Sequence, residues 1–328
     1  MISTPILRAS AIAILNISLV AFATGALNTQ SAHAAAPMVK KQAPGYYRMM
    51  LGEFEVTALS DGTLDLPMDK LLTNTTAAAT NKALSSYFLK NPVETSVNAY
   101  LINTGTKLVM IDTGAAKLFG PTLGNLLTNL KASGYQPEQI DEIYITHMHG
   151  DHIGGLMDGD KLAFPNAVVR ADKRDADFWL SQANMDKAPA DGKDGFKGAM
   201  ASINPYVKAG KFQPVDGATD LVPGVKAASS YGHTPGHTTY VVESKGEKLV
   251  LWGDLMHAAA VQFAAPGVTI QFDSNTKAAA AERAKAYAAA AKAGYLVAAT
   301  HLSFPGMGHL RAAGKGYTWV PVNYTALR

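Results

Sequence analysis

Three histidines and an aspartate lie within six residues near the middle of the chain, at His147, His149, Asp151 and His152. Imidazole and carboxylate groups are the ligands of hydrolytic zinc, manganese, iron and cobalt sites. The mostly apolar run 140–145 before them predicts a strand, and side chains at a strand end lie at the rim of a sheet. A solvated histidine turn is the alternative, but such a cluster is typical of a metal or catalytic site. The sequence therefore predicts bound metal.

Three more strand-like runs lead to residues of the same ligand types. These are 225–231 before His233, 248–253 before Asp254, and 295–300 before His301. Because a sheet gathers its strand ends along one edge, the four segments are expected to converge in space. A second histidine of the 232–238 segment, His237, is a weaker ligand candidate.

Alternation and helical spacing predict the elements that must position these residues. In the first half we expect two strands around Gly52, a helix over 77–89, a hairpin of strands 96–103 and 107–111, and a helix over 123–132. In the second half we expect a strand over 166–171, a helix over 173–181, strands over 225–231, 238–244 and 247–252, and an alanine-rich helix over 275–293.

The stretch 182–198 is rich in Lys, Asp, Gly and Ala, and it predicts a mobile loop. Ser274 or Asn275 can cap the start of the alanine-rich helix, and Gly294 suits its end. The order of strands and helices, repeated in both halves, predicts an α/β (α+β) fold in which two mixed sheets face each other with helices outside.

The N-terminus has the pattern of a secretory signal peptide over 1–34. A short positive start precedes an uncharged, mostly apolar run, and small residues around His33 offer a cleavage site after Ala34. A membrane anchor is the alternative, but the run is short for a bilayer span. We expect export to the periplasm or the outside, with an extension over 35–44 and one domain over 45–328.

Charge and composition exclude several functions. The chain has 29 basic and 26 acidic residues, with no basic stripe for nucleic acid and no polybasic patch for a membrane surface. It has no cysteine, which excludes thiolate nucleophiles and cysteine-ligated zinc. No Gly-x-Ser-x-Gly elbow is present either, so a serine hydrolase is not indicated.

The motifs resemble those of the metallo-β-lactamase superfamily in spacing and order. The resemblance rests on the histidine cluster, the 232–237 segment, Asp254, His301 and the 112–114 turn. The segments 252–257 and 301–306 are similar to the branch that contains methyl parathion hydrolase and its lactonase relatives, the dihydrocoumarin hydrolases. The resemblance implies an αββα sandwich, two metal ions at one edge of the sheets, and a homodimer.

The resemblance also implies a ligand set. One ion is expected at His147, His149 and His233, the other at Asp151, His152 and His301, with Asp254 between them. His237 is expected to support the ligands, and Asp112 and His309 to be structural. The ions are expected to be zinc, with manganese, iron or cobalt as alternatives.

The implied mechanism is hydrolysis by a hydroxide that bridges the two ions. Asp151 and Asp254 are expected to be catalytic as ligands, and His257 to act on the substrate carbonyl or the leaving phenolate. A packing role for His257 is the alternative. No organic cofactor is needed.

Aromatic and aliphatic residues are expected to form the substrate pocket. Phe119, Trp179 and Phe196 match the pocket mouth of the methyl parathion hydrolase branch, although each alone would be typical of a core. The predicted pocket also includes Leu64, Leu66, His257, Ile270 and Phe272.

Some of these residues depart from the organophosphate enzymes. His257, Ile270 and Phe272 are bulkier or more polar than their counterparts, Leu72 replaces a basic residue, and the loop near Gly192 is shorter. Such a pocket favours a planar aryl lactone over a tetrahedral phosphotriester. Methyl parathion hydrolysis as the main activity, an acyl-homoserine lactonase, a β-lactamase, an iron-dependent oxidoreductase and a non-catalytic binding protein are the alternatives.

Overall fold

The computed structural model describes Met1 and residues 36–327, and the chain divides into two compact units, Met1–Lys41 and Gln42–Arg328. The described residues of the first unit form no helix or strand. The predicted signal peptide lies outside the described residues. Within the described part, no helix has the length and apolar character to cross a membrane.

The first sheet of the second unit has six strands in the order β1-β2-β4-β5-β6-β9. Its strands are β1 (Tyr46–Leu51), β2 (Phe54–Leu66), β4 (Val93–Asn103), β5 (Leu108–Ile111), β6 (Glu142–Tyr144) and β9 (Val168–Arg170). The first four strands pair antiparallel, whereas β5, β6 and β9 run parallel. The predicted turn at Gly52 and the predicted hairpin are confirmed.

The second sheet has seven strands in the order β10-β11-β12-β13-β15-β16-β17. Its strands are β10 (Thr219–Val222), β11 (Val225–Ser229), β12 (Thr238–Ser244), β13 (Glu247–Leu251), β15 (Leu296–Ala298), β16 (Met307–Ala313) and β17 (Gly316–Pro321). Two small pairs join β3 (Leu72–Thr73) to β14 (Thr269–Ile270) and β7 (Met157–Asp158) to β8 (Lys161–Leu162).

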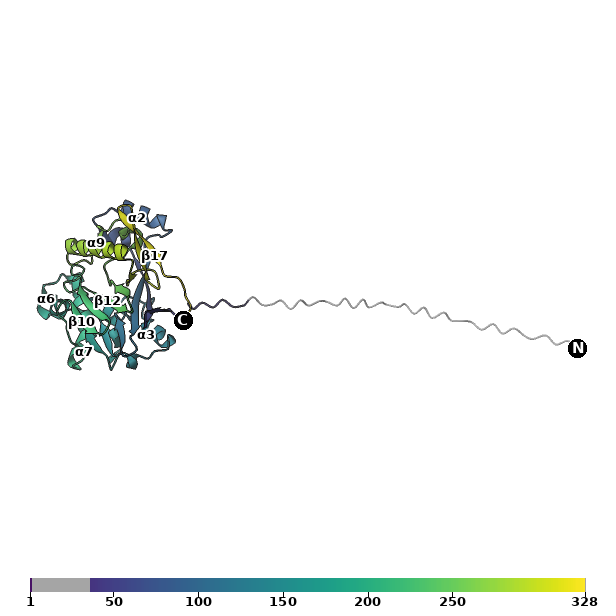
Figure 1. The fold of residues 1–328 in the computed structure, drawn as a ribbon, viewed down its shortest axis with the longest axis horizontal. Helices are drawn as coiled ribbons and strands as arrows, with labels where there is room; N and C mark the ends of the chain where they lie inside the picture. Colours follow the sequence, from purple (N-terminus) through teal and green to yellow (C-terminus); the bar gives the residue numbers. More distant parts are fainter. Residues whose placement is uncertain (2–35, 328) are drawn as a thin grey trace. The chain divides into compact units, whose positions relative to one another are not determined.

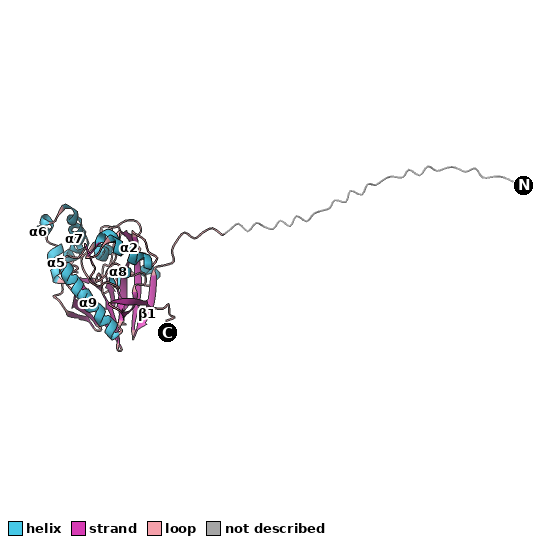
Figure 2. Cartoon of the chain, turned by 90° about the horizontal axis from the view of Figure 1, so that it is seen from above, coloured by secondary structure: helices cyan, strands magenta, loops and turns pink. Residues whose placement is uncertain are grey.

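Helices flank both sheets (Figures 1 and 2). The longer ones are α2 (Ala77–Ser86), α3 (Leu126–Ala132), α5 (Lys173–Trp179), α6 (Gln182–Lys187), α7 (Lys193–Lys208) and α9 (Thr276–Ala293). The shortest are α1 (Met68–Leu71), α4 (Gly150–Ile153) and α8 (Ala259–Gln262), and single 3₁₀ turns span Pro137–Gln139, Gly154–Leu156 and Ala190–Gly192. Helix α3 packs on β2, and α9 packs on β16.

Three apolar layers explain this arrangement. Between the sheets, side chains such as Tyr100 and Tyr144 of the first sheet meet Tyr240 and Leu251 of the second. Tyr144 and Tyr240 stack with ring centroids 5.6 Å apart, a geometry worth about 0.5–1.5 kcal/mol beyond the area buried. Separate clusters lie between the first sheet and its helices and between the second sheet and α9. The layers follow the order α/β/β/α, which confirms the predicted fold.

The alanine-rich helix α9 begins and ends as the sequence predicts. The Asn275 side chain accepts a hydrogen bond from the Ala278 N–H at the start, and Gly294 adopts a left-handed φ of 71° at the end. Only glycine adopts that conformation without steric cost, so Gly294 stops the helix.

The prediction of a mobile loop over 182–198 is wrong. This stretch forms α6, a 3₁₀ turn and the start of α7, with Ser181 accepting a hydrogen bond from Asn184 N–H at the α6 cap. Phe196, Ile203 and Tyr206 share one face of α7 and are buried in the cluster under the first sheet. Tertiary packing of this face outweighs the polar composition that indicated a loop.

Candidate active site

The four predicted ligand segments meet at one edge of the two sheets. His147 follows β6, His233 lies between β11 and β12, Asp254 follows β13 and His301 follows β15. The Thr238 N–H donates to the Thr146 carbonyl over 2.8 Å, which joins the sheets beside the histidine cluster. The expected convergence is therefore present, and it produces two groups of ligand atoms.

The first group contains His147, His149, His233 and Asp254. His147 Nε2 lies 3.0 Å from His149 Nδ1 and 3.2 Å from His233 Nε2. The third side of the triangle, between His149 Nδ1 and His233 Nε2, measures 3.1 Å. A tetrahedral zinc ion with bonds of about 2.0–2.1 Å holds its nitrogens about 3.3 Å apart, so the triangle has nearly the size that such an ion requires.

The second group contains Asp151, His152, Asp254 and His301. Asp151 Oδ2 lies 3.3 Å from His301 Nε2 and 3.6 Å from His152 Nε2. Asp254 completes this group, with Oδ1 3.3 Å from His152 Nε2 and Oδ2 3.2 Å from His301 Nε2. Two carboxylates and two imidazoles form a ligand set that can bind several divalent ions, such as zinc, manganese, iron and cobalt.

Asp254 belongs to both groups. Its Oδ2 also lies 3.6 Å from His147 Nε2 and 3.4 Å from His233 Nε2. Within the described residues, Asp254 Oδ1 and His152 Nε2 are buried without a hydrogen-bond partner. An unsatisfied buried polar atom costs about 1–3 kcal/mol, and a coordinated cation would remove that cost at both atoms. The donor set thus fits two divalent metal ions with Asp254 between them.

Hydrogen bonds orient the histidines of the second group. His152 Nδ1 lies 2.8 Å from Asp112 Oδ2, and the same carboxylate accepts hydrogen bonds from Thr146 N–H and Oγ1–H. His301 donates its Nδ1–H to the Ser96 carbonyl over 2.9 Å. A ring whose Nδ1 donates in this way presents the lone pair of Nε2 to a metal ion.

His237 holds the backbone of Asp254 and is absent from both ligand groups. Its Nδ1–H donates to the Ser230 carbonyl over 3.0 Å, and its Nε2 accepts the Asp254 N–H over 3.1 Å. The backbone turns toward it at Gly253, which has a φ of 54°. A Cβ there would lie 2.8 Å from the Thr146 side chain and 3.0 Å from His237 Nε2, so a larger residue would displace both.

The pKa of His147 and His149 is lowered, whereas that of His233 in the same group is raised, as it is for His152 and His301 of the second group. Burial, together with the neighbouring His233, lowers the pKa of His149 to about 3. Burial also opposes charge on His301, but the carboxylates of Asp254 and Asp151 outweigh it and raise the pKa of His301 to about 10. His149 is therefore neutral and ready to coordinate, whereas a metal ion must displace a proton from His301.

His257 lies against the metal groups without belonging to either. Its Nε2 is 3.0 Å from Asp254 Oδ2, and its ring stacks on His301 with centroids 5.0 Å apart. Burial lowers the pKa of His257 to about 4, although Asp254 opposes this shift. Its Nδ1 is buried and has no hydrogen-bond partner among the described residues.

Asp175 has a structural role that the sequence did not indicate. Its carboxylate accepts hydrogen bonds from Met148 N–H (2.9 Å), Thr234 Oγ1–H (3.0 Å) and Gly236 N–H (2.5 Å). It therefore ties the 147–152 segment to the 232–237 segment. Burial raises the pKa of Asp175 to about 6. In the sequence it is one of several charged residues in a short helix, and no motif distinguishes it.

A cavity of about 370 Å³ opens beside His149. Trp179, Phe196 and Phe272, which the sequence predicts as pocket residues, line it together with Phe178 and Pro189. The Trp179 ring stands edge-on to the His149 ring with centroids 5.3 Å apart. An aromatic slot therefore lies directly against the first group of ligands.

The other predicted pocket residues lie elsewhere. The Phe119 ring is 50% exposed and covers Gly150, where an added Cβ would lie 2.9 Å from it. Ile270 has no exposed surface and packs with Met68 and Leu72, a cluster that Leu66 also joins. Leu64 packs with a separate small cluster around Val97. Ile270, Leu64 and Leu66 can thus influence the cavity only through intervening residues.

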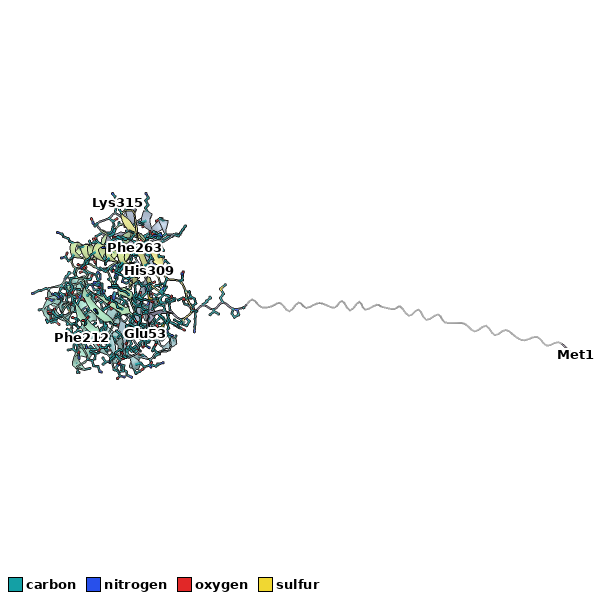
Figure 3. The ribbon with its side chains drawn as sticks, viewed as in Figure 1. Met1, Glu53, Phe212, Phe263, His309 and Lys315 are labelled. Atoms are coloured by element: carbon teal, nitrogen blue, oxygen red, sulfur yellow. The ribbon has the colours of Figure 1, made fainter. Side chains whose placement is uncertain are left out.

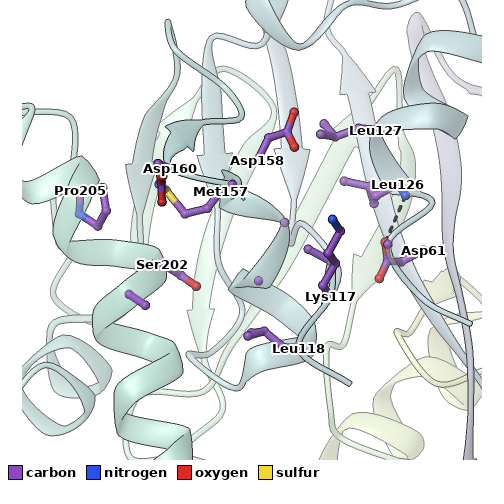
Figure 4. A pocket seen from close by; sticks show the side chains of 16 residues that line it. Asp61, Lys117, Leu118, Leu126, Leu127, Met157, Asp158, Asp160, Ser202 and Pro205 are labelled. Carbon is purple, nitrogen blue, oxygen red and sulfur yellow. Dashed lines mark hydrogen bonds between the residues drawn. The ribbon is translucent and has the colours of Figure 1, made fainter. Parts of the chain in front are cut away.

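A larger cavity of about 530 Å³ lies between α3 and α7 and contains no metal-ligand candidate. Figure 4 shows Leu126 and Leu127 on one side, Ser202 and Pro205 on the other, and Lys117 between them. His309, drawn in Figure 3, is also remote from the ligand groups, and its Nδ1 hydrogen-bonds to the Gly294 carbonyl. Neither feature adds to the chemistry at the sheet edge.

Curated relatives of the chain include N-acyl homoserine lactonases of Bacillus. The protein from Bacillus cereus is 25% identical over 183 residues, covering 49% of this chain and 64% of the relative. A beta-lactamase-like protein 2 homolog of Drosophila melanogaster is 31% identical over 163 residues, covering 48% of this chain and 46% of the relative. The chain thus spans less than two thirds of the length of the curated relatives it matches.

Solved structures match over a larger part of the chain. The hydrolase AbOPH, described as a member of the beta lactamase superfamily, has a TM-score of 0.83 and 39% identity, covering 87% of this chain and 100% of its own. The dizinc quorum-quenching lactonase AidC has a TM-score of 0.78 and 27% identity, and the match covers 86% of this chain and 99% of AidC. A family model described as the metallo-beta-lactamase superfamily matches residues 92–311, which include all seven ligand candidates. With this match, the sandwich fold and the ligand groups at its edge, the chain belongs to the metallo-beta-lactamase superfamily.

Proposed function

We propose that the chain is a binuclear zinc hydrolase that opens aryl lactones of the dihydrocoumarin type. The observation that carries the proposal is the aromatic slot of Trp179, Phe196 and Phe272 beside the ligand His149. A flat aryl ring stacks well on aromatic side chains, and its fused lactone would then reach the ligand groups. Zinc is proposed because histidine and aspartate are its usual ligands in hydrolases, and the related AidC is a dizinc enzyme.

Two divalent ions at these positions supply a water that is ionised near neutral pH and a Lewis acid for the substrate carbonyl. Asp254 would help to hold both ions, because its Oδ1 lies near His152 of the second group and its Oδ2 lies near histidines of both groups. His237 holds the Asp254 backbone, and Asp112 holds the ring of His152. These contacts keep the ligands in place before substrate arrives, which lowers the cost of reorganisation during the reaction.

His257 is proposed to tune Asp254 and to contact the substrate. While its Nε2–H donates to Asp254, its Nδ1 is an acceptor, because a neutral imidazole carries one proton. In that form the ring can accept a hydrogen bond but cannot donate one to a carbonyl or a phenolate. Donation would require the other tautomer or a protonated ring, and the lowered pKa of His257 disfavours the protonated ring.

Acyl-homoserine lactone hydrolysis is the second candidate, because the curated Bacillus relatives carry that activity in their names. Such substrates combine a small lactone with an aliphatic chain. The cavity lining of Phe178, Trp179 and Phe196 favours a compact aromatic group over a long chain. Phosphotriester hydrolysis is proposed as a side activity, since the same metal chemistry serves a P=O centre.

The proposal is tested by measuring kcat/KM for dihydrocoumarin, N-hexanoyl-homoserine lactone and methyl parathion on one zinc-loaded sample. We expect the highest value for dihydrocoumarin. A higher value for the acyl-homoserine lactone, rising with chain length, would make the protein an acyl-homoserine lactonase. A higher value for methyl parathion would make it a phosphotriesterase.

Export and dimerisation complete the proposal. The N-terminal pattern over 1–34 supports cleavage after Ala34 and a periplasmic or extracellular enzyme. The sequence of the mature N-terminus in a bacterial host and the mass in solution test these two points. A retained leader or a monomer would contradict them.

A further inference from the structure

Helix α9 contains a buried arginine that is not part of the metal centre. Arg283 has no exposed surface, although the helix around it is mostly alanine. Arginine remains charged in proteins, and a charge without water costs several kcal/mol unless it has partners. The partners of Arg283 therefore indicate why a cation is present at this position.

Arg283 binds two segments that reach the metal ligands. Its Nε–H donates to the carbonyl of Leu255, the residue after Asp254, which belongs to both ligand groups. Its Nη1–H donates to the carbonyls of Val268 (2.7 Å) and Pro266 (3.2 Å). The guanidinium thus joins the 254–255 turn to the segment that leads into Asp273.

Asp273 connects the arginine to a histidine ligand. Its Oδ2 lies 3.8 Å from Arg283 Nη2 and accepts the Ile270 N–H over 3.2 Å. Its Oδ1 lies 2.9 Å from His233 Nδ1. A carboxylate at Nδ1 fixes the tautomer of the ring and turns the Nε2 lone pair toward the first ligand group.

The start of α9 is also fixed to the His233 segment by its backbone. Ser274 N–H donates to the His233 carbonyl and Asn275 N–H to the Gly232 carbonyl, both over 2.8 Å. At Gly232, where φ is 143°, an added Cβ would lie 2.3 Å from the Ala279 nitrogen. The helix and the ligand segment therefore form one rigid contact, and a displacement of α9 would displace His233.

We infer that Arg283 is a positioning residue of the metal centre, which holds His233 through Asp273 and Asp254 through the Leu255 carbonyl. It touches neither substrate nor metal ligand side chains. His233 belongs to the first group alone, whereas Asp254 belongs to both groups, so the first group depends more strongly on Arg283 than the second group does. The inference concerns metal binding and holds whichever ester the enzyme hydrolyses.

The test compares zinc affinity in Arg283→Met, Asp273→Asn and the control Lys285→Met. Methionine fills much of the space of the arginine stem without its charge, and Lys285 is an exposed residue on the same helix. Zinc removal is followed by competition with a chromophoric chelator. We expect about a 10- to 100-fold loss of affinity for the zinc of the first ligand group in the first two variants, and none in the control.

Cobalt substitution identifies the affected ion. The visible absorption of Co²⁺ depends on its ligands, so disturbance of His233 should alter the band of the three-histidine site. The band of the site with Asp151 and His301 should change less. Equal changes in both bands would contradict the assignment.

A purely structural role for Arg283 predicts a different result. Thermal unfolding of the metal-free variant would then occur at a lower temperature, while zinc affinity and the cobalt spectrum of the folded protein stayed unchanged. That outcome would overturn the inference. If Arg283→Met does not fold, Asp273→Asn and Arg283→Lys decide the question. Arg283→Lys keeps the charge but has fewer hydrogen-bond donors, so its zinc affinity should fall less than that of Asp273→Asn.

A double-variant cycle adds an independent readout. If Arg283 acts through Asp273, the combined variant should lose less affinity than the two single losses multiplied together. Multiplicative losses would mean that the two residues act separately, and they would contradict the proposed path to His233.

Discussion

The metal half and the substrate half of the site are built differently. In the metal half, His147, His152 and Asp254 are almost completely buried, and ligands such as His152 are oriented by a further hydrogen bond. In the substrate half, Phe272 lines the cavity and is 41% exposed, whereas Trp179 and Phe196 are buried. The first half is rigid because its groups are desolvated and interlinked, whereas the second is bounded in part by side chains at the surface.

The difference indicates how the chemistry and the substrate choice are separated. A buried polar network depends on each of its members, because the loss of one leaves the others unsatisfied. An exposed aromatic ring contributes contact area and little else, so its replacement changes substrate fit at small cost in stability. We therefore expect changes in the metal half to affect all substrates, and changes in the substrate half to affect their ranking.

Removal of a metal ligand should have the largest effect. His149→Ala opens the triangle of ring nitrogens that forms the first group. We expect turnover of every ester to fall on the order of a thousandfold or more, with loss of one metal ion per chain. Metal analysis and kcat/KM on dihydrocoumarin and methyl parathion check this. Full activity with one bound ion would refute the two-ion assignment.

Asp175→Ala should be the most damaging change outside the ligands. It leaves the buried donors of Met148, Thr234 and Gly236 without an acceptor. We expect a loss of about 3–5 kcal/mol in the free energy of unfolding, together with weaker zinc binding. Denaturant unfolding with and without zinc measures both effects. Asp177→Ala, a change at an exposed position of the same helix, is the matched control.

The pH dependence of the free energy of unfolding should reflect the raised pKa of Asp175. Its pKa is about 6 in the folded protein against 3.8 for the free side chain, so the folded state binds the extra proton between these values. The resulting stabilisation is complete below pH 4 and is lost as the pH rises through 6, by at most about 3 kcal/mol. In metal-free protein, the stability of the wild type relative to Asp175→Asn should fall from pH 4 to pH 7. A constant or rising difference would contradict the raised pKa.

The combined variant His257→Leu with Phe272→Leu should change the ranking of substrates. Phe272 lines the cavity, and the ring of His257 lies behind it, with ring centroids 6.0 Å apart. Leucine in place of Phe272 is smaller, and leucine in place of His257 removes a polar ring beside Asp254, so we expect the ratio of methyl parathion to dihydrocoumarin efficiency to rise about tenfold. An unchanged ratio would show that these rings do not limit substrate shape.

Phe119→Ala should have the smallest effect on the folded protein. Its half-exposed ring covers Gly150 but takes part in none of the apolar clusters. We expect a change in unfolding free energy of about 0.5 kcal/mol or less. A few-fold rise in KM for aryl lactones would support the predicted contact with substrate, whereas an unchanged KM would limit Phe119 to a surface role.

The convergence of the predicted ligand residues could be expected from the sequence, because these residues follow regular strands and four of them lie within six residues. The 147–152 cluster, Asp254 and His301 all stand directly after apolar runs that form strands. The supporting residues were harder to find. Asp175 and Asp273 reach their partners through tertiary contacts that span 27 to 61 residues of sequence, and no local pattern encodes such contacts.

The same reason explains the error at 182–198 and the position of Ile270. The many polar residues of 182–198 lie on the solvent face of its helices, so the composition alone suggested a loop. The structure shows that Phe196 and Ile203 of α7 pack in the cluster under the first sheet, and this contact stabilises the helix. The resemblance to a family correctly indicated Trp179, Phe196 and Phe272 as residues that line the cavity. It did not indicate that Ile270 lies behind the surface of the cavity, in a cluster with Met68.

The hydrogen bond between Thr238 and Thr146 has a consequence for the order of folding and metal loading. It joins the two sheets beside ligands that are far apart in the chain: 86 residues separate His147 from His233. An ion cannot nucleate such a site from a short peptide, because long loops must close first at an entropic cost. The sheets must therefore assemble before the ions enter. Cells short of the required divalent metal should accumulate a folded, inactive precursor that added metal activates without new protein synthesis.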